Sequence, residues 1–386
     1  MSENKALVGA AVIGQSGGPS AVINASAYGV IKTALAADCI TEVYGAFHGI
    51  KGVLDERLMD MSKEDPAELE LLLHTPSSAL GSCRYKIADP EADDTDYKRI
   101  LEVFKKYNVR YFFYNGGNDS MDTCNKVNRY LKSVGYECRV FGVPKTIDND
   151  LFGTDHCPGF SSAAKYIATS IMEVSRDCQV YDTGMITIVE CMGRHAGWLT
   201  AAASLAAEKG DGPDLIYLPE RDFSMDQFLD DVIAVYKRKG ECLIAVSEGV
   251  HYADGTFVSE AKTSGTDGFG HAQLGGLAAR LAGIVKAATG AKVRGIELSL
   301  LQRCAAPPAA TSRRASTPAR SPSRARSRAN PARWSASAAS VRTATSATMS
   351  CSTSKRSQTS SRRCPPRGST QRATTSRRTS STIARR

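Results

Sequence analysis

The sequence predicts an α/β protein built from two doubly wound, three-layer domains with largely parallel sheets. Apolar runs of strand length alternate with amphipathic helical stretches over the first 304 of its 386 residues. Glycine-rich or polar turns follow several of these runs, and the chain is long enough for two domains with buried sheets. Because parallel sheets bind ligands beyond the carboxyl ends of their strands, we expect the active site in the cleft between the domains.

The first series of elements opens with an apolar strand over 6–13, a turn that contains Gly17 and Gly18, and a helix over 21–37. The pattern then predicts a strand at 42–46, a long connection, a helix at 96–107, a strand at 109–114, a helix that ends at 131 and a strand at 140–143. Strand and helix alternate, as in a parallel sheet with helices on both faces. We assign the first domain to residues 1–155.

A second series of the same kind follows. It comprises helices at 161–175, 196–207, 225–239 and 273–288, and strands at 185–190, 215–218, 242–246 and 292–301. We assign the second domain to residues 156–304, with the alternative that part of 271–304 packs back on the first domain.

The turn after the strand at 109–114 has the composition of a phosphate cradle. It reads Gly116-Gly117-Asn118-Asp119-Ser120. Glycines let a phosphate approach the backbone, and a polar pair opens a helix whose first N–H groups attract anions.

The turn after the strand at 140–143 combines one ammonium with two carboxylates. Its residues, 144–150, read PKTIDND and include Lys145, Asp148 and Asp150. This mixture suits metal-assisted phosphoryl transfer, because it offers a cation for phosphate, a carboxylate for Mg²⁺ and a second carboxylate as base.

The net charge of +9 averages two unlike parts of the chain. Residues 305–386 contain 17 Arg, one Lys and no acidic residue, so they carry +18 and leave −9 for residues 1–304. This tail of Arg, Ser, Ala, Thr and Pro is too poor in large apolar residues to form a core. It is either a disordered basic arm that binds nucleic acid or the product of a reading frame that slips near Cys304. We favour the frame slip, which predicts a non-native tail, no nucleic-acid partner, and a printed chain that is unstable or inactive.

The rest of the composition predicts a cytoplasmic protein. The 11 cysteines are scattered without a C-x-x-C pair, as expected of reduced, buried thiols. The apolar runs are too short to span a membrane, and residues 1–5 (MSENK) lack the layout of a signal peptide.

Taken together, these segments resemble the phosphofructokinase family, continuously from about Val8 to Cys304. The resemblance implies a Mg²⁺-dependent, homo-oligomeric enzyme, dimer or tetramer, that phosphorylates fructose 6-phosphate. It places the phosphoryl donor on residues 1–155 and the sugar phosphate on 156–304. Asp119 and Lys145 resemble the pyrophosphate-using branch, whereas ATP-using members carry glycine at the first position and commonly at the second.

The resemblance also implies which residues hold the donor: Gly17, Arg84, Gly116, Gly117, Asp119, Ser120 and Lys145. The turn at Gly17 offers backbone N–H groups, and Arg84 reaches the phosphates. A carboxylate at Asp119 repels the α-phosphate of ATP and fills its space. Lys145 holds pyrophosphate oxygens and neutralises charge in the transition state.

For catalysis, Asp148 matches the family's general base, which takes the proton of the C1 hydroxyl as that oxygen attacks phosphorus. The predicted catalytic set is Asp148, Lys145, Thr146 and Arg194. Asn118 stands where many members have a metal-binding aspartate. We therefore predict Mg²⁺ at Asn118 and Asp150, with Asp150 carrying more of the binding.

The implied sugar-phosphate residues are Thr146, Ile147, Asp148, Met192, Gly193, Arg194, Glu248, Arg294 and Arg303. Glu248 matches a glutamate that binds sugar hydroxyls. Arg294 and Arg303 are nine apart, like two family arginines that grip the 6-phosphate, one of them from a neighbouring subunit. Leu300 and Met185 depart from the family pattern and leave the intersubunit part of this site open.

Three alternatives stay open at this point. An ATP-dependent 6-phosphofructokinase would have the same fold. A relative of NAD or lipid kinases would share only the cradle. That alternative does not explain why the chain also has Met192-Gly193-Arg194 and Glu248. The third is an inactive chain whose basic tail binds nucleic acid.

Overall fold

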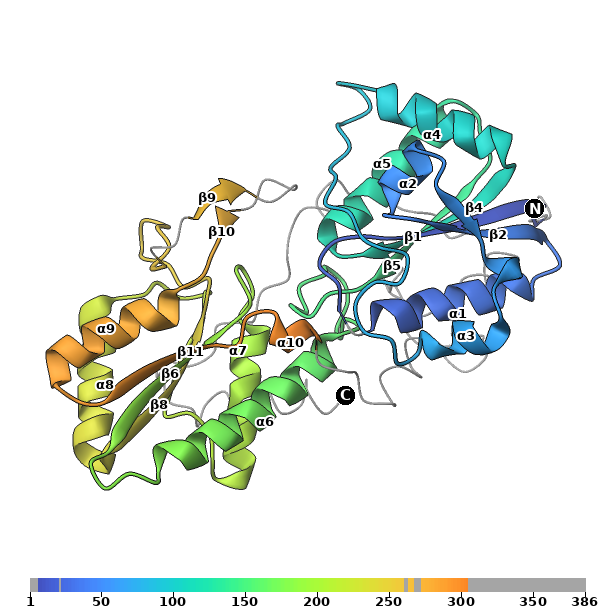
Figure 1. Cartoon of the computed structure of the whole chain (residues 1–386). Helices are drawn as coiled ribbons and strands as arrows, with labels where there is room; N and C mark the ends of the chain where they lie inside the picture. The colour runs from blue at the N-terminus through green and yellow to red at the C-terminus, as the bar shows by residue number, and fades with distance from the viewer. Residues whose placement is uncertain (1–5, 21, 260–262, 267–271, 305–386) are drawn as a thin grey trace, which may run out of the picture. The chain divides into compact units, whose positions relative to one another are not determined.

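The computed structural model describes residues 6–20, 22–259, 263–266 and 272–304, so the predicted tail at 305–386 lies outside the described residues. These residues form two compact units (Figure 1). The first unit takes the chain up to Thr146 and adds Leu151–Gly159. The second takes Ile147–Asp150 and the chain from Phe160 onward.

A five-stranded sheet in the order β3-β2-β1-β4-β5 forms the centre of the first unit. Its strands are β1 (Gly9–Gln15), β2 (Ile40–Ala46), β3 (Leu58–Asp60), β4 (Val109–Gly116) and β5 (Arg139–Pro144). All neighbours pair in parallel except β2 and β3, which are antiparallel. The predicted mostly parallel sheet is therefore confirmed for this unit.

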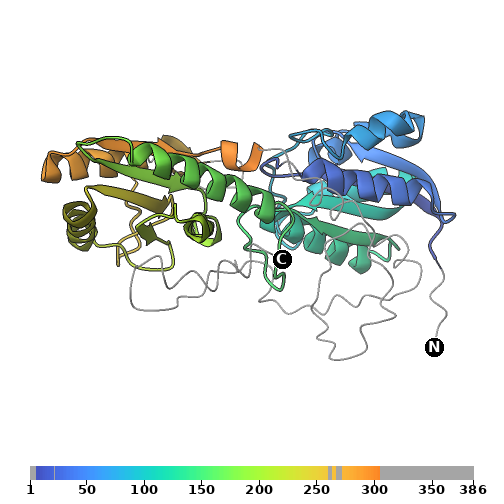
Figure 2. The same ribbon diagram turned by 90° about the horizontal axis from the view of Figure 1, so that it is seen from below.

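Helices cover both faces of this sheet, as Figure 2 shows for α1 (Ile23–Leu35) and α5 (Asn118–Ser133). Successive strand residues point to opposite faces. Ala11 and Ile13 accordingly pack with α1, while Val12 packs with α2 (Ile50–Leu54), α4 (Thr95–Lys106) and α5. Apolar runs buried on both faces are typical of such strands.

The connection between β2 and α4 contains more structure than the sequence predicts. It holds α2, β3, the 3₁₀-helix η1 (Met61–Lys63) and α3 (Pro66–Leu71). Asp65 caps α3 by accepting a hydrogen bond from the Ala67 N–H (2.7 Å), and Pro66 occupies the first turn. Residues 73–94 then cross the unit without a helix or strand.

The second unit has a four-stranded, wholly parallel sheet in the order β11-β6-β8-β7. Its strands are β6 (Met185–Cys191), β7 (Leu215–Tyr217), β8 (Glu241–Ser247) and β11 (Val293–Glu297). In Figure 1, α6 (Phe160–Cys178) and α7 (Trp198–Ala202) cover one face, and α8 (Met225–Lys239) and α9 (Leu277–Thr289) the other. The short strands β9 (Thr263–Thr266) and β10 (Ala272–Gln273) pair separately, and α10 (Leu301–Cys304) ends the described chain.

Element boundaries differ from the prediction where glycine or positive φ interrupts a pattern. The helix expected from 273 begins at Leu277, after Gly276 with φ of +79°. The strand expected to reach 301 ends at Glu297, and Ser299 has φ of +43°. The helix expected over 196–207 becomes α7 followed by the 3₁₀-helix η2 (Ala203–Lys209).

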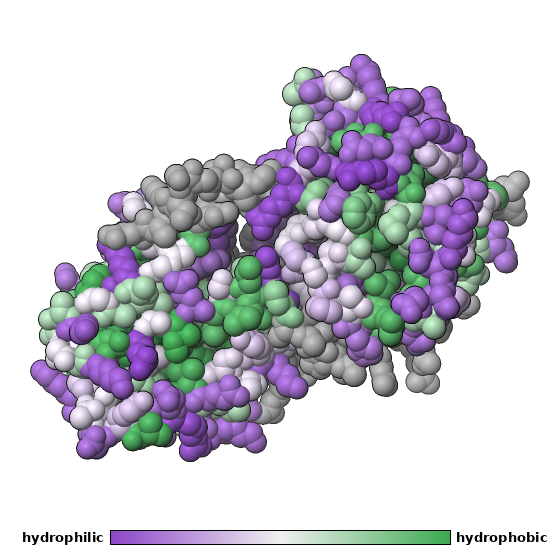
Figure 3. All heavy atoms as spheres, viewed as in Figure 1, coloured by the Kyte–Doolittle hydropathy of each residue, from purple (hydrophilic) through white to green (hydrophobic). Residues whose placement is uncertain are grey.

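The surface around α4 is mainly hydrophilic in the view of Figure 3, in keeping with the charged outer face of that helix. Across the described ranges, no helix combines the length and apolar character that crossing a membrane requires.

Candidate active site

In the first unit successive strands are added first on one side of β1 and then on the other. β2 lies on one side of β1 and β4 on the other, so the carboxyl ends of β1 and β4 form a topological switch point. Gln15 and Asn115 are register partners there, and the glycine turns that follow the two strands therefore lie at one edge. This is the place where doubly wound sheets bind ligands.

The cradle after β4 has the predicted turn-to-helix form. Gly117 has extended backbone and precedes α5, whose first turn contains Asn118 and Asp119. Gly116 has no room for a side chain, because a Cβ there would collide with the Ser120 side chain. Ser120 is buried at 2% exposure under the turn. The N-terminal N–H groups of α5 thus open beside two glycines, as an anion site requires.

Lys145 joins this cradle to the turn after β1. Its ammonium Nζ donates a hydrogen bond to the Gly18 carbonyl oxygen at 2.5 Å, and its backbone N–H donates to Gly116 O at 2.9 Å. The residue is only 5% exposed. Gly17, with φ of +77°, keeps a left-handed turn in which a Cβ would lie 3.7 Å from the same ammonium. A positive charge is therefore held against the carbonyl of one glycine turn and the backbone of the other.

Arg84 lies at this edge because the two residues before it, Ser82 and Cys83, are hydrogen-bonded to Gly17. The Gly17 N–H donates to Cys83 O (3.2 Å), and Ser82 Oγ donates to Gly17 O (2.6 Å). Arg84 itself is exposed. The structure thus brings all seven sequence-predicted donor residues to one edge of the first sheet, while their roles stay predictions.

The stretch that carries the predicted base divides between the units. Thr146 donates its N–H to Pro158 O (3.2 Å) and bridges Gly159 in the first unit. Ile147 belongs to the apolar core of the second unit together with α6. Asp148 is half-buried in a turn that Asn149, with φ of +55°, completes. Asparagine tolerates this left-handed conformation better than most residues.

The two predicted magnesium ligands, Asn118 and Asp150, both offer side-chain oxygen atoms. Asn118 lies in the first turn of α5 and Asp150 is buried in the second unit, so whether they share one ion stays a prediction. No group of three His, Cys, Asp or Glu able to hold a metal occurs among the residues that the structure describes. Mg²⁺ commonly binds through one or two protein oxygens, with phosphate oxygens and water as its other ligands, and these residues suit that mode.

In the second unit, the loop after β6 is fixed from two directions. Glu248, after β8, accepts the Gly193 N–H at 3.2 Å through Oε1, and Gln302 accepts the Met192 N–H at 3.2 Å. Ser247 Oγ donates to Gly193 O at 2.6 Å. The loop Met192-Gly193-Arg194 and Glu248 therefore meet at the carboxyl edge of this sheet. Burial raises the pKa of the Glu248 carboxyl, which the Gly193 N–H and Arg194 oppose.

The two predicted phosphate-binding arginines lie on different elements of this unit, Arg294 on β11 and Arg303 on α10. The Gln302 side chain in α10 accepts a hydrogen bond from the Met192 N–H. Arg303 is the next residue of α10 and therefore lies near the loop Met192-Gly193-Arg194. Arg294 lies on β11 in register with Thr187, before the last four residues of β6, and is exposed. That Arg294 binds the sugar phosphate in the site of a neighbouring subunit stays a prediction.

Sequence reasoning missed the side chains that hold these loops. Ser247, Gln302 and Glu190 are buried, at 0%, 2% and 5% exposure. Glu190 Oε2 accepts the Ala278 N–H (2.9 Å) at the start of α9, whose cap position is a glycine. Burial raises the pKa of Glu190 to about 7. The sequence signal that could have identified Glu190 is its place as a charged residue within the mainly apolar strand β6.

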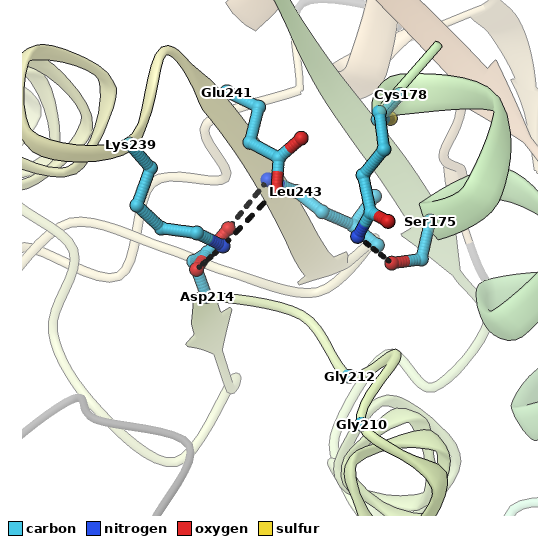
Figure 4. A pocket seen from close by; sticks show the side chains of 9 residues that line it. Ser175, Cys178, Gly210, Gly212, Asp214, Lys239, Glu241 and Leu243 are labelled. Carbon is cyan, nitrogen blue, oxygen red and sulfur yellow. Dashed lines mark hydrogen bonds and ion pairs between the residues drawn. The ribbon is translucent and has the colours of Figure 1, made fainter.

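A separate pocket lies at the opposite edge of the second sheet, where β8 begins (Figure 4). Lys239 Nζ there pairs with Asp214 (2.8 Å) and Glu241 (3.4 Å), and Asp214 also accepts the Leu243 N–H (3.0 Å). Two carboxylates thus already balance its lysine. None of the predicted site residues lines this pocket.

Comparison with known sequences agrees with the motifs. The family model described as phosphofructokinase matches residues 10–319. A pyrophosphate–fructose 6-phosphate 1-phosphotransferase of Halomonas elongata is 48% identical over 295 residues, which cover 75% of this chain and 70% of the relative. A protein of the same name from Xanthomonas campestris is 50% identical over 294 residues, with the same two coverages.

Solved structures agree as well. A pyrophosphate-dependent phosphofructokinase from Nitrosospira multiformis matches with a TM-score of 0.70 at 40% identity, covering 79% of this chain and 73% of the other. The corresponding protein from Marinobacter aquaeolei gives 0.68 at 41% identity, covering 80% and 73%. With the cradle, the buried lysine and the Met-Gly-Arg loop in their places, the chain belongs to the phosphofructokinase family.

Proposed function

We propose that this protein transfers a phosphoryl group from pyrophosphate to fructose 6-phosphate, giving fructose 1,6-bisphosphate and phosphate, in a reversible step of glycolysis and gluconeogenesis. The observation that carries the choice of donor is the hydrogen bond from Lys145 to Gly18. It holds a buried ammonium where ATP-using relatives are expected to have glycine. Four relatives that carry the pyrophosphate enzyme's name, at 45–50% identity, support the same choice.

In the proposed reaction the C1 hydroxyl oxygen of the sugar attacks the terminal phosphorus of pyrophosphate. A new oxygen–phosphorus bond forms, the bridging oxygen–phosphorus bond breaks, and phosphate leaves. Asp148 takes the hydroxyl proton. Lys145, Arg84 and the N–H groups of the glycine turns neutralise charge on the donor, since such reactions are accelerated mainly by positioning and electrostatics.

Magnesium is part of the proposal, with Asn118 and Asp150 supplying oxygen ligands. When bound, it would neutralise phosphate oxygens and orient the donor. We also infer that the first unit binds pyrophosphate and the second binds fructose 6-phosphate through Arg194, Glu248 and Arg303. A homo-oligomer in the cytoplasm, in which Arg294 serves a neighbouring subunit, completes the proposal.

Asp119 makes the alternative of ATP as donor less favourable. Its carboxylate stands in the first turn of α5, beside the two cradle glycines. A nucleotide's α-phosphate in that place would meet a negative charge, whereas pyrophosphate ends before it. Comparing kcat/KM for pyrophosphate and for ATP, at saturating fructose 6-phosphate, tests the proposal. A higher value with ATP would overturn it.

A further inference from the structure

A cluster of buried amide side chains lies beneath the turn after β1. Gln15 ends β1, Asn24 lies in the first turn of α1 and Asn115 lies near the end of β4, and all three are fully buried. Gln15 Nε2 donates to Asn24 Oδ1 (3.0 Å), and Asn115 Nδ2 donates to Ile23 O (2.9 Å). Through these two hydrogen bonds Gln15 and Asn115 tie the start of α1 to the ends of both strands.

The outer side of the same cluster faces residues 75–80, which form neither helix nor strand. Gln15 and Asn24 supply side-chain partners to this irregular backbone. The bonds are Asn24 Nδ2 to Thr75 O (3.0 Å), Ala79 N to Asn24 Oδ1 (2.8 Å) and Leu80 N to Gln15 Oε1 (2.9 Å). Each amide therefore donates on its nitrogen and accepts on its oxygen, which fixes its orientation.

Residues 75–80 lead directly into the segment that carries Arg84. Ser78 Oγ lies 2.7 Å from both Gln15 Oε1 and Gly81 O, and its single proton donates to one of them at a time. Two residues further on, Cys83 O accepts the Gly17 N–H. Hydrogen bonds thus tie the buried amides to residues 75–80 and the glycine turn to Ser82 and Cys83, and Arg84 follows directly in the same segment.

We infer that Gln15 and Asn24 are positioning residues that set the affinity for pyrophosphate, because they hold the Arg84 segment against the Gly17 turn. This inference rests on the proposed function for its ligand. Both side chains are completely buried, so they act through Arg84 and the Gly17 N–H and do not touch the donor. A misplacement of about 1 Å in such a group is enough to lower activity by about 100-fold.

The test uses the full chain with Asn24→Ala and the milder Ser78→Ala, which removes one hydroxyl from a half-buried position. Val30→Ala is the matched control, because Val30 is buried in the same helix and packs against the sheet. Hydrogen exchange of residues 75–84 and calorimetric binding of pyrophosphate with Mg²⁺ are measured. Both network variants should exchange faster over 75–84, and Asn24→Ala should weaken pyrophosphate binding about tenfold or more. Val30→Ala should lower Tm and leave both readouts unchanged.

The outcomes separate this inference from the proposed function. Unchanged exchange over 75–84 in both network variants would overturn the positioning role, whatever the ligand. Faster exchange with no loss of pyrophosphate affinity would overturn the link to the donor. If the unaltered chain binds ATP with Mg²⁺ more tightly than pyrophosphate while exchange responds as expected, the positioning of the segment holds and the donor assignment fails.

Discussion

Lys145 donates a hydrogen bond from its buried ammonium to the carbonyl oxygen of Gly18, although 127 residues separate the two in sequence. The contact joins the end of β5 to the turn after β1 across the switch point of the first sheet. The buried ammonium brings a positive charge to this edge of the sheet, and a positive charge attracts an anionic ligand. We therefore expect the charge of Lys145 to organise the proposed donor site.

Replacing this lysine by methionine tests that charge. Lys145→Met keeps the length and apolar stem, so the fold should persist. The loss of charge neutralisation should lower kcat/KM for pyrophosphate by about 10²–10³-fold, the usual cost of losing one such group. Lys126→Met is the matched control: Lys126 is also largely buried, but pairs with Asp122 on the same helix (2.8 Å). Equal effects of the two substitutions would contradict the assignment.

Asp119 should act as a barrier to nucleotides. Asp119→Gly removes the carboxylate that repels an α-phosphate, so the ratio of kcat/KM for ATP to that for pyrophosphate should rise, and rise further in a double variant with Lys145→Gly. Asp122→Gly, three residues later in α5, puts a glycine in the same helix outside the predicted cradle and should leave the ratio unchanged. Steady-state kinetics with both donors measures this. A ratio that stays at the wild-type value in the double variant would show that these side chains do not select the donor.

Asp148 should be needed mainly for the chemical step, and its loss should change sugar-phosphate binding little. Asp148→Asn preserves size but cannot take the proton, so kcat should fall by about 10²–10⁴-fold. The affinity for fructose 6-phosphate, measured by calorimetry, should stay within about threefold of wild type, because Arg194, Glu248 and Arg303 are unchanged. A near-normal kcat would show that Asp148 is not the general base.

The buried Glu190 predicts a specific dependence of stability on pH. Its pKa is about 7 in the folded protein against 4.5 ordinarily, so the folded state holds the proton more tightly than the unfolded state. The free energy of unfolding should therefore fall as pH rises from about 4.5 to about 7, by about 3 kcal/mol for this group.

Glu190→Gln should remove that decline, since an amide can accept the Ala278 N–H without carrying charge. Thermal melts at pH 5 and pH 8 measure the difference. Glu102→Gln, which changes an exposed carboxylate in the other unit, should keep the wild-type difference. A Glu190→Gln variant with the wild-type slope would show that this carboxyl does not titrate in the expected window.

The strand–helix alternation and the glycine turns were enough to predict the α/β class and most elements, because both are local signals. The candidate site residues of the first unit follow from motifs; the structure places Lys145 beside Gly17, and their roles stay predictions. The supporting residues were not predictable in this way. Gln15, Asn24 and Gln302 matter through partners far away in sequence, and only the fold brings those partners to them.

The elements of the long connection escaped prediction for a related reason. Its helices α2 and α3 are five and six residues long, too short to show a hydrophobic period. The 3₁₀-helix η2 likewise depends on packing against α6 rather than on a pattern of its own.

The central claim is best tested by following the products with phosphorus NMR when fructose 6-phosphate and Mg²⁺ are mixed with pyrophosphate or with ATP. The chain as printed is compared with one in which residues 305–386 are replaced by the C-terminal part of the Halomonas relative. The account predicts that the second protein forms fructose 1,6-bisphosphate and phosphate in equal amounts from pyrophosphate, and faster than it uses ATP. Faster turnover with ATP, or pyrophosphate hydrolysis without sugar bisphosphate, would contradict it.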